Sequence, residues 1–155
     1  MPFPVTTSMK PIYDRKSFSP NEAIGALIGR TRKTMIQKID AQLAPLQVSA
    51  AQWLVVLLLG EGAAATAAEL CELLSYDPGA MTRLLDRLES KSILRRVRGG
   101  ADRRSVQLEL TAGGKTLYPK ILAAMVDVFN RLLHGFARGE VNQLEDYLRR
   151  MLANA

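Results

Sequence analysis

Residues 77–111 hold the most informative pattern of the chain, DPGAMTRLLDRLESKSILRRVRGGADRRSVQLELT. Asp77 directly before Pro78 predicts a helix start, because Asp is a favoured N-cap and proline suits the first helical turn. The apolar residues that follow recur at i, i+3, i+4 and i+7, which predicts one buried face made of Met81, Leu84, Leu85 and Leu88. The opposite face is polar and basic.

A β-hairpin is expected directly after this helix. Apolar and polar residues alternate over residues 94–97 and 106–110, and residues 99–103, which begin with two glycines, form the connection. The tip of this hairpin is basic. A short helix with a basic face followed by such a hairpin predicts a winged helix-turn-helix.

Helical patterns precede this unit. Ser19, Pro20 and an apolar stripe up to Pro45 predict a long helix that begins at Pro20. Two capping boxes then predict two short helices, one opened by Ser49 with Gln52 over residues 50–59, the other by Thr66 with Glu69.

Two more helices are expected after the hairpin. Thr111 caps a long one, in which Pro119 predicts either a kink or a later start. The last begins at about Gly139 and carries an apolar stripe.

The predicted fold class is mainly α with a small β-hairpin, a winged helix-turn-helix domain flanked by N- and C-terminal dimerisation helices. Residues 1–19 are proline-rich and form an arm that either hangs free or packs elsewhere. Residues 20–155 are expected to form a single domain. Within it the winged helix covers about 48–111, and the dimerisation helices cover about 20–44 and 112–155.

Composition limits the class of protein. The chain has 155 residues, of which 48% are hydrophobic and 23% charged, as in globular domains. Its single cysteine, Cys71, cannot form an internal disulfide. The longest apolar run, residues 53–59, is too short to span a membrane, and the first 16 residues lack the apolar block of a secretory signal. We therefore expect a cytoplasmic protein with no membrane partner.

The net charge of +6 is concentrated in two segments, one before residue 39 and one between residues 81 and 104. The second segment has eight basic and three acidic residues, whereas residues 39–80 have five acidic residues and no basic one. A basic helix face that enters the major groove of DNA explains this distribution, and Arg83 is the candidate for a bidentate guanine contact. A solvated basic face is the alternative. The candidate DNA-binding residues of the helix are Pro78, Gly79, Ala80, Thr82, Arg83 and Arg87.

The hairpin tip adds Asp102, Arg103 and Arg104. Arginine on a narrow ribbon suits the minor groove, whose negative potential attracts guanidinium groups. Asp102 is expected to hold an arginine in place, because a carboxylate is repelled by phosphate. An ordinary polar turn is the alternative.

Residues 82–89 (TRLLDRLE), 94–96 (LRR), 102–105 (DRRS) and 110–114 (LTAGG), together with 49–53 (SAAQW), resemble the MarR family of bacterial transcriptional regulators. The resemblance covers roughly residues 20–153. It implies a bridge between Asp102 and an arginine that braces the wing, and leaves open whether Arg103 or Arg104 enters the minor groove. Ser92 and Ala80 depart from the family pattern, where Gly and Ser or Thr are usual.

The first and last helices carry more apolar surface than one winged helix can bury, which predicts an intermolecular bundle. The resemblance implies the same: a homodimer that acts as a repressor on a pseudo-palindromic double-stranded operator and is released by a small aromatic or phenolic effector. Candidate effector contacts are Trp53, Arg30 and Tyr118. Core packing or surface solvation is the alternative for each of the three.

Two other classes of function are considered. A winged-helix protein interaction module without sequence-specific DNA binding would favour acidic rather than basic surfaces. An enzyme would need a nucleophile with a base or a phosphate loop, and Gly99-Gly100 and Gly113-Gly114 lack that context. No catalytic residue, cofactor or metal site is therefore expected.

Overall fold

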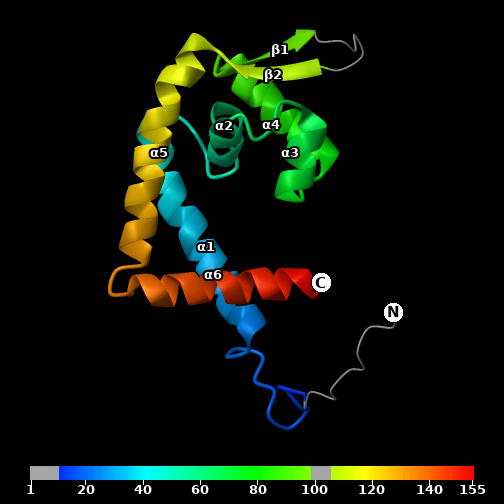
Figure 1. Ribbon diagram of the computed structural model, residues 1–155, viewed down its shortest axis with the longest axis vertical. Helices are drawn as coiled ribbons and strands as arrows, with labels where there is room; N and C mark the ends of the chain where they lie inside the picture. Colours follow the sequence, from blue (N-terminus) through cyan, green and yellow to red (C-terminus); the bar gives the residue numbers. More distant parts are fainter. Residues whose placement is uncertain (1–10, 99–105) are drawn as a thin grey trace. The chain divides into compact units, whose positions relative to one another are not determined.

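The computed structural model describes residues 11–98 and 106–155. Within these residues the chain forms helices and one antiparallel hairpin in the predicted order, so the mainly α fold with a winged helix is confirmed (Figure 1). The elements are α1 (Ile24–Leu43), the 3₁₀ turn η1 (Ala44–Leu46), α2 (Trp53–Gly60), α3 (Ala67–Leu74), α4 (Pro78–Ser90), β1 (Leu94–Arg98), β2 (Val106–Leu110), α5 (Ala112–Leu132) and α6 (Arg138–Ala153).

The chain divides after Met35 into two compact units, and α1 runs through the division. In the first unit the rings of Tyr13 and Phe18 meet edge to face, with centroids 5.5 Å apart. This contact gives the segment before α1 a small apolar cluster of its own.

Helix α1 begins at Ile24, four residues later than the predicted start at Pro20. The backbone N–H of Glu22 donates to the Ser19 carbonyl at 3.1 Å, which makes a turn before the helix. The N–H of Ile24 donates to the Tyr13 hydroxyl at 3.2 Å. A residue outside the local sequence therefore caps this helix, which local capping rules do not anticipate.

The predicted caps of α3, α4 and α5 are confirmed in the second unit. Thr66 and Glu69 form both halves of a capping box at the start of α3. Asp77 Oδ1 accepts the N–H of Ala80 at 2.7 Å, and Thr111 Oγ1 accepts the N–H of Gly114 at 3.1 Å. Each bond satisfies a donor that the first helical turn leaves without a partner.

The start of α2 differs from its prediction, whereas the start of α5 agrees with its predicted cap. Helix α2 begins at Trp53 rather than residue 50, and only the half of its box in which the N–H of Ser49 donates to Gln52 Oε1 (3.2 Å) is formed. Helix α5 begins at Ala112 and runs through Pro119, so its start is not displaced. Its N-cap, Thr111, is satisfied, and this favours the early start despite the proline.

Helices α2, α3 and α4 pack with the hairpin into the core of the second unit (Figure 1). Leu94 pairs with Leu110 in the hairpin, and both side chains are buried. The N–H of Leu108 donates to the Ala65 carbonyl at 2.7 Å, which ties β2 to the loop before α3. The predicted apolar face of α4 is buried, with Met81, Leu84, Leu85 and Leu88 each at most 1% exposed.

Gly114 allows α5 to start close to the hairpin. A β-carbon at this position would lie 2.0 Å from the Ile93 carbonyl oxygen, a distance that only the absence of a side chain permits. No helix within residues 11–98 and 106–155 has the length and apolar character needed to cross a membrane.

Candidate nucleic-acid interface

At the amino end of α4, the side chain of Asp77 forms its predicted capping bond, and small residues follow it. Asp77 caps the helix, Pro78 occupies its first turn, and Gly79 and Ala80 follow. A β-carbon on Gly79 would lie 3.6 Å from Arg83 Nη1, so the Arg83 guanidinium lies back over the first turn. A β-carbon at residue 79 would be in ordinary van der Waals contact with this arginine, and Gly79 leaves that space open beside the guanidinium.

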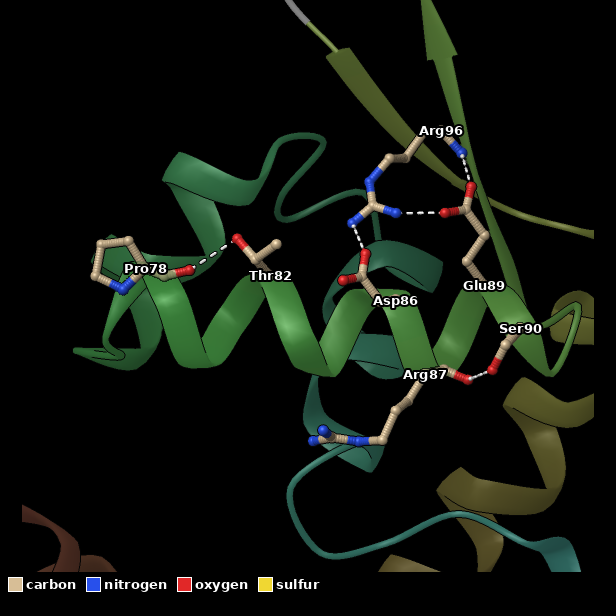
Figure 2. A network of polar contacts seen from close by, with 7 residues as sticks. All are labelled: Pro78, Thr82, Asp86, Arg87, Glu89, Ser90 and Arg96. Atoms are coloured by element: carbon tan, nitrogen blue, oxygen red, sulfur yellow. Dashed lines mark hydrogen bonds and ion pairs between the residues drawn. The ribbon is translucent and has the colours of Figure 1, made fainter.

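Arg83 and Arg87 are four residues apart, so they lie on neighbouring turns of one face of α4. Both side chains are exposed. Figure 2 shows Arg87 on the side of α4 opposite to Arg96. The two arginines place two permanent positive charges along one exposed stripe of the helix.

Thr82 has a more limited role than the sequence suggested. Its hydroxyl donates to the Pro78 carbonyl at 2.9 Å, as Figure 2 shows. This back-bond uses the hydroxyl proton within the helix. Thr82 can therefore offer a DNA base only its oxygen lone pairs and its methyl group.

Arg96 joins α4 to the hairpin, and sequence reasoning did not single it out. From β1 it donates through Nη2 to Asp86 Oδ1 at 2.7 Å and through Nη1 to Glu89 Oε2 (Figure 2). Its backbone N–H also donates to Glu89 Oε1, at 3.2 Å. The sequence did hold one signal for this contact: Asp86 and Glu89 are three residues apart on α4, so both carboxylates lie on one face of the helix.

The charge state of Arg96 follows from these contacts. Partial burial opposes its charge, but the hydrogen bonds and attraction of Asp86 and Glu89 outweigh it and raise the pKa of Arg96. The two carboxylates of α4 are thus paired with a cation of the same protein. Their repulsion of a nearby phosphate backbone is reduced accordingly.

Arg95 has a different, weaker partner. It lies opposite Glu109 in the hairpin register and donates to Glu109 Oε2 through Nη2 at 2.8 Å. Both side chains are about half exposed or more, with values of 65% and 48%, so this pair adds little stability. Arg95 and Arg96 are therefore engaged within the hairpin and α4, whereas Arg83 and Arg87 present their charge outward.

The hairpin tip, with Asp102, Arg103 and Arg104, lies outside the described residues. Their assignment to the minor groove stays a prediction.

Two of the three candidate effector residues, Trp53 and Tyr118, belong to the second unit. Trp53 is half-buried, with its ring centroid 6.1 Å from that of Phe129. The Tyr118 ring covers Gly60, where a β-carbon would lie 2.2 Å from Tyr118 Cδ2. Arg30 belongs to the first unit and is exposed.

A cavity of about 490 Å³ lies between the carboxyl-terminal half of α1 and α5. Arg131 Nη2 donates to Gln42 Oε1 at 2.6 Å across it. Its lining combines cations with an apolar wall: Lys38, Ala41, Gln42, Val128, Arg131 and Leu132. None of the three sequence candidates is among these residues.

Comparison with known proteins supports the same kind of site. A sequence model of the MarR family matches residues 46–105. Multiple antibiotic resistance protein MarR of Escherichia coli is 32% identical over 130 residues, which are 83% of this chain and 90% of that protein. The HTH-type transcriptional repressor MdtR of Bacillus subtilis is 27% identical over 121 residues, which are 78% of this chain and 76% of that protein.

A solved structure extends the comparison to a complex. The crystal structure of a mutant E. coli MarR complexed with operator DNA is 35% identical, with a TM-score of 0.75. The match covers 85% of this chain and 96% of that one. These relatives are transcriptional regulators, which confirms the expectation that the chain is not an enzyme.

Proposed function

Since the chain belongs to the MarR family of transcriptional regulators, which bind operator DNA, we propose that it is a homodimeric repressor released from its operator by a small organic anion. The main observation in favour of DNA binding is that Arg83 and Arg87 are both exposed on α4. The two carboxylates of this helix, Asp86 and Glu89, are paired with Arg96. Such a regulator works where the DNA is, which for a relative of bacterial proteins is the cytoplasm.

Helix α4 is the recognition helix in this proposal and enters the major groove. An α-helix fits that groove, and its amino-terminal residues reach the base edges. Arg83 reads a base, Arg87 contacts the backbone, and Thr82 meets a base through its methyl group or oxygen. The remaining helix contacts, Pro78, Gly79 and Ala80, allow close approach of the backbone. Asp102, Arg103 and Arg104 remain the predicted minor-groove contacts.

A binding titration tests the proposed function. Duplexes selected from a random-sequence library by the wild-type protein are titrated at several salt concentrations. With about six phosphate contacts per dimer, the logarithm of affinity should fall with the logarithm of salt with a slope near −5. A flat dependence, or failure to select any common sequence, would contradict sequence-specific DNA binding.

The proposed homodimer is joined through the terminal helices. None of the residues of α6, all of which the structure describes, is buried. Leu144, Tyr147, Leu148 and Met151 nevertheless lie at i, i+3, i+4 and i+7 and are 40–53% exposed. Helix α1 adds three exposed apolar residues: Ile24, Leu27 and Ile28. Apolar stripes of this kind on two helices favour burial against a second copy.

The effector is proposed to bind in the cavity between α1 and α5. Lys38 and Arg131 supply positive charge, whereas Ala41, Val128 and Leu132 supply an apolar wall. The cavity volume of about 490 Å³ is within the range of small-molecule sites. This combination suits a carboxylate or phenolate on an apolar body.

The effector prediction uses 2-hydroxybenzoate as a probe. Arg131→Gln should weaken its binding about tenfold by isothermal titration, since a charged hydrogen bond is worth about 1.5–3 kcal/mol before solvent screening. Arg149→Gln, which removes an exposed charge from α6, is the matched control and should bind as the wild type does. If Trp53→Phe or Tyr118→Phe weakens binding instead, the effector binds at the residues predicted from the sequence and not in this cavity.

A further inference from the structure

Lys91 follows the last residue of α4 and belongs to the basic segment that the sequence assigned to DNA. Its ammonium is engaged elsewhere. Nζ donates to the Gln47 carbonyl oxygen at 2.7 Å and to Gln52 Oε1 at 3.3 Å. Both acceptors are about forty residues earlier in the chain, in the connector between α1 and α2.

The connector at residues 44–52 is itself tightly specified. Gln47 has the left-handed φ of 56°, which turns the chain at the end of η1. Gln52 is the one buried polar side chain within the described residues, with 2% of its surface exposed. Its Oε1 accepts from the N–H of Ser49 as well as from Lys91. Lys91 therefore meets a part of the fold with little freedom to move.

The same connector is bonded to α1. Asp40 Oδ1 accepts the N–H of Ala50 at 2.6 Å. Asp40 lies in the carboxyl-terminal half of α1, and Leu43 at its end is fully buried. Polar contacts thus run from the end of the recognition helix to the connector and from the connector to α1.

We propose that Lys91 is a positioning residue for DNA binding: its ammonium holds the carboxyl end of α4 against the connector and so sets the spacing of the two recognition helices in a dimer. This inference rests on the proposed function. A dimer binds two half-sites at a fixed separation, so a recognition helix with a variable orientation binds the full operator less well. The apparent affinity falls in proportion to the fraction of molecules in the competent orientation.

The test compares Lys91→Met, Lys91→Arg and wild type on the selected operator and on the same operator with one base pair inserted between its half-sites. Lys91→Met should bind the operator about tenfold more weakly, as expected if about a tenth of the dimers remain correctly arranged. The penalty for the inserted base pair should be smaller than in wild type. Lys91→Arg keeps a donor for the Gln47 carbonyl and should recover most of the affinity.

The salt dependence separates positioning from a direct phosphate contact. If Lys91 only positions α4, Lys91→Met leaves the slope of the logarithm of affinity against the logarithm of salt unchanged. If each Lys91 contacted a phosphate, the substitution would reduce the magnitude of this slope by about 1.8 for the dimer. Lys120→Met removes the same charge from the exposed surface of α5 and is the control. Circular dichroism melting checks that the variants are folded.

A reduced slope with an unchanged spacing penalty would overturn the proposal, and so would wild-type binding by Lys91→Met. If the wild-type protein selects no DNA sequence, the proposed function fails, and the inference about Lys91 fails with it. The proposal is supported if Lys91→Met binds the operator more weakly, keeps the salt slope of wild type and loses less affinity than wild type when a base pair is inserted.

Discussion

Leu148→Glu is expected to convert the proposed dimer into monomers and to abolish tight operator binding. Leu148 lies at the centre of the exposed stripe on α6, and 40% of its surface is accessible in the single chain. In a symmetric dimer each substitution is present twice. An unpaired carboxylate at an apolar interface costs several kcal/mol, so dimerisation should weaken by about 10³-fold or more.

Sedimentation equilibrium measures this loss directly. Because no residue of α6 is buried within the described chain, the monomer should keep its helical circular dichroism. Asn142→Asp adds a negative charge to another face of α6 and should leave the dimer intact. A Leu148→Glu protein that sediments as a dimer would show that the stripe on α6 is not the interface.

Arg83→Ala is expected to remove much of the preference for the selected operator while leaving weak binding to other sequences. A bidentate contact from arginine to guanine is worth about 1–3 kcal/mol of discrimination. Two copies in the proposed dimer should therefore reduce the preference for the operator by between about 30-fold and about 25,000-fold. The geometry favours this role because the Arg83 guanidinium lies over the first turn of α4, beside Gly79.

Competition between the operator and single-base variants measures the lost preference. Arg95→Ala removes the same charge from an arginine that is paired with Glu109 in the hairpin, and it should retain the wild-type base preference. If Arg83→Ala weakens binding to all duplexes equally, Arg83 contacts phosphate and another residue reads the bases.

Local sequence rules were sufficient to predict a helix cap where the capping interaction spans one helical turn. Asp77 and Thr111 each accept an N–H three residues ahead, and Thr66 does so with Glu69 completing the box. The buried face of α4 also followed from spacing alone, because a helix brings residues i, i+3 and i+4 to one side. These features, with the hairpin that follows, were enough to predict the winged helix and its exposed basic face.

The charge count of residues 81–104 gave every basic residue the same weight. In the fold, some of these residues are exposed and others are paired with carboxylates or carbonyls of the protein. Arg83 and Arg87 face outward, whereas Arg96 pairs with Asp86 and Glu89. The hydrogen bonds of Lys91 to the connector separate it from the two outward arginines in the same way. Which basic residues remain available for DNA depends on carboxylates and carbonyls contributed by other elements.

The order of the elements, the caps of α3, α4 and α5, and the basic face of α4 were thus predictable from the amino-acid sequence, because their causes lie within a few residues. The Tyr13 cap of α1, the cavity between α1 and α5, and the contacts of Arg96 and Lys91 required the folded chain. Tyr13 caps a helix eleven residues away, and Lys91 meets Gln47 across 44 residues. Packing of the core creates such contacts, and no sequence period specifies them.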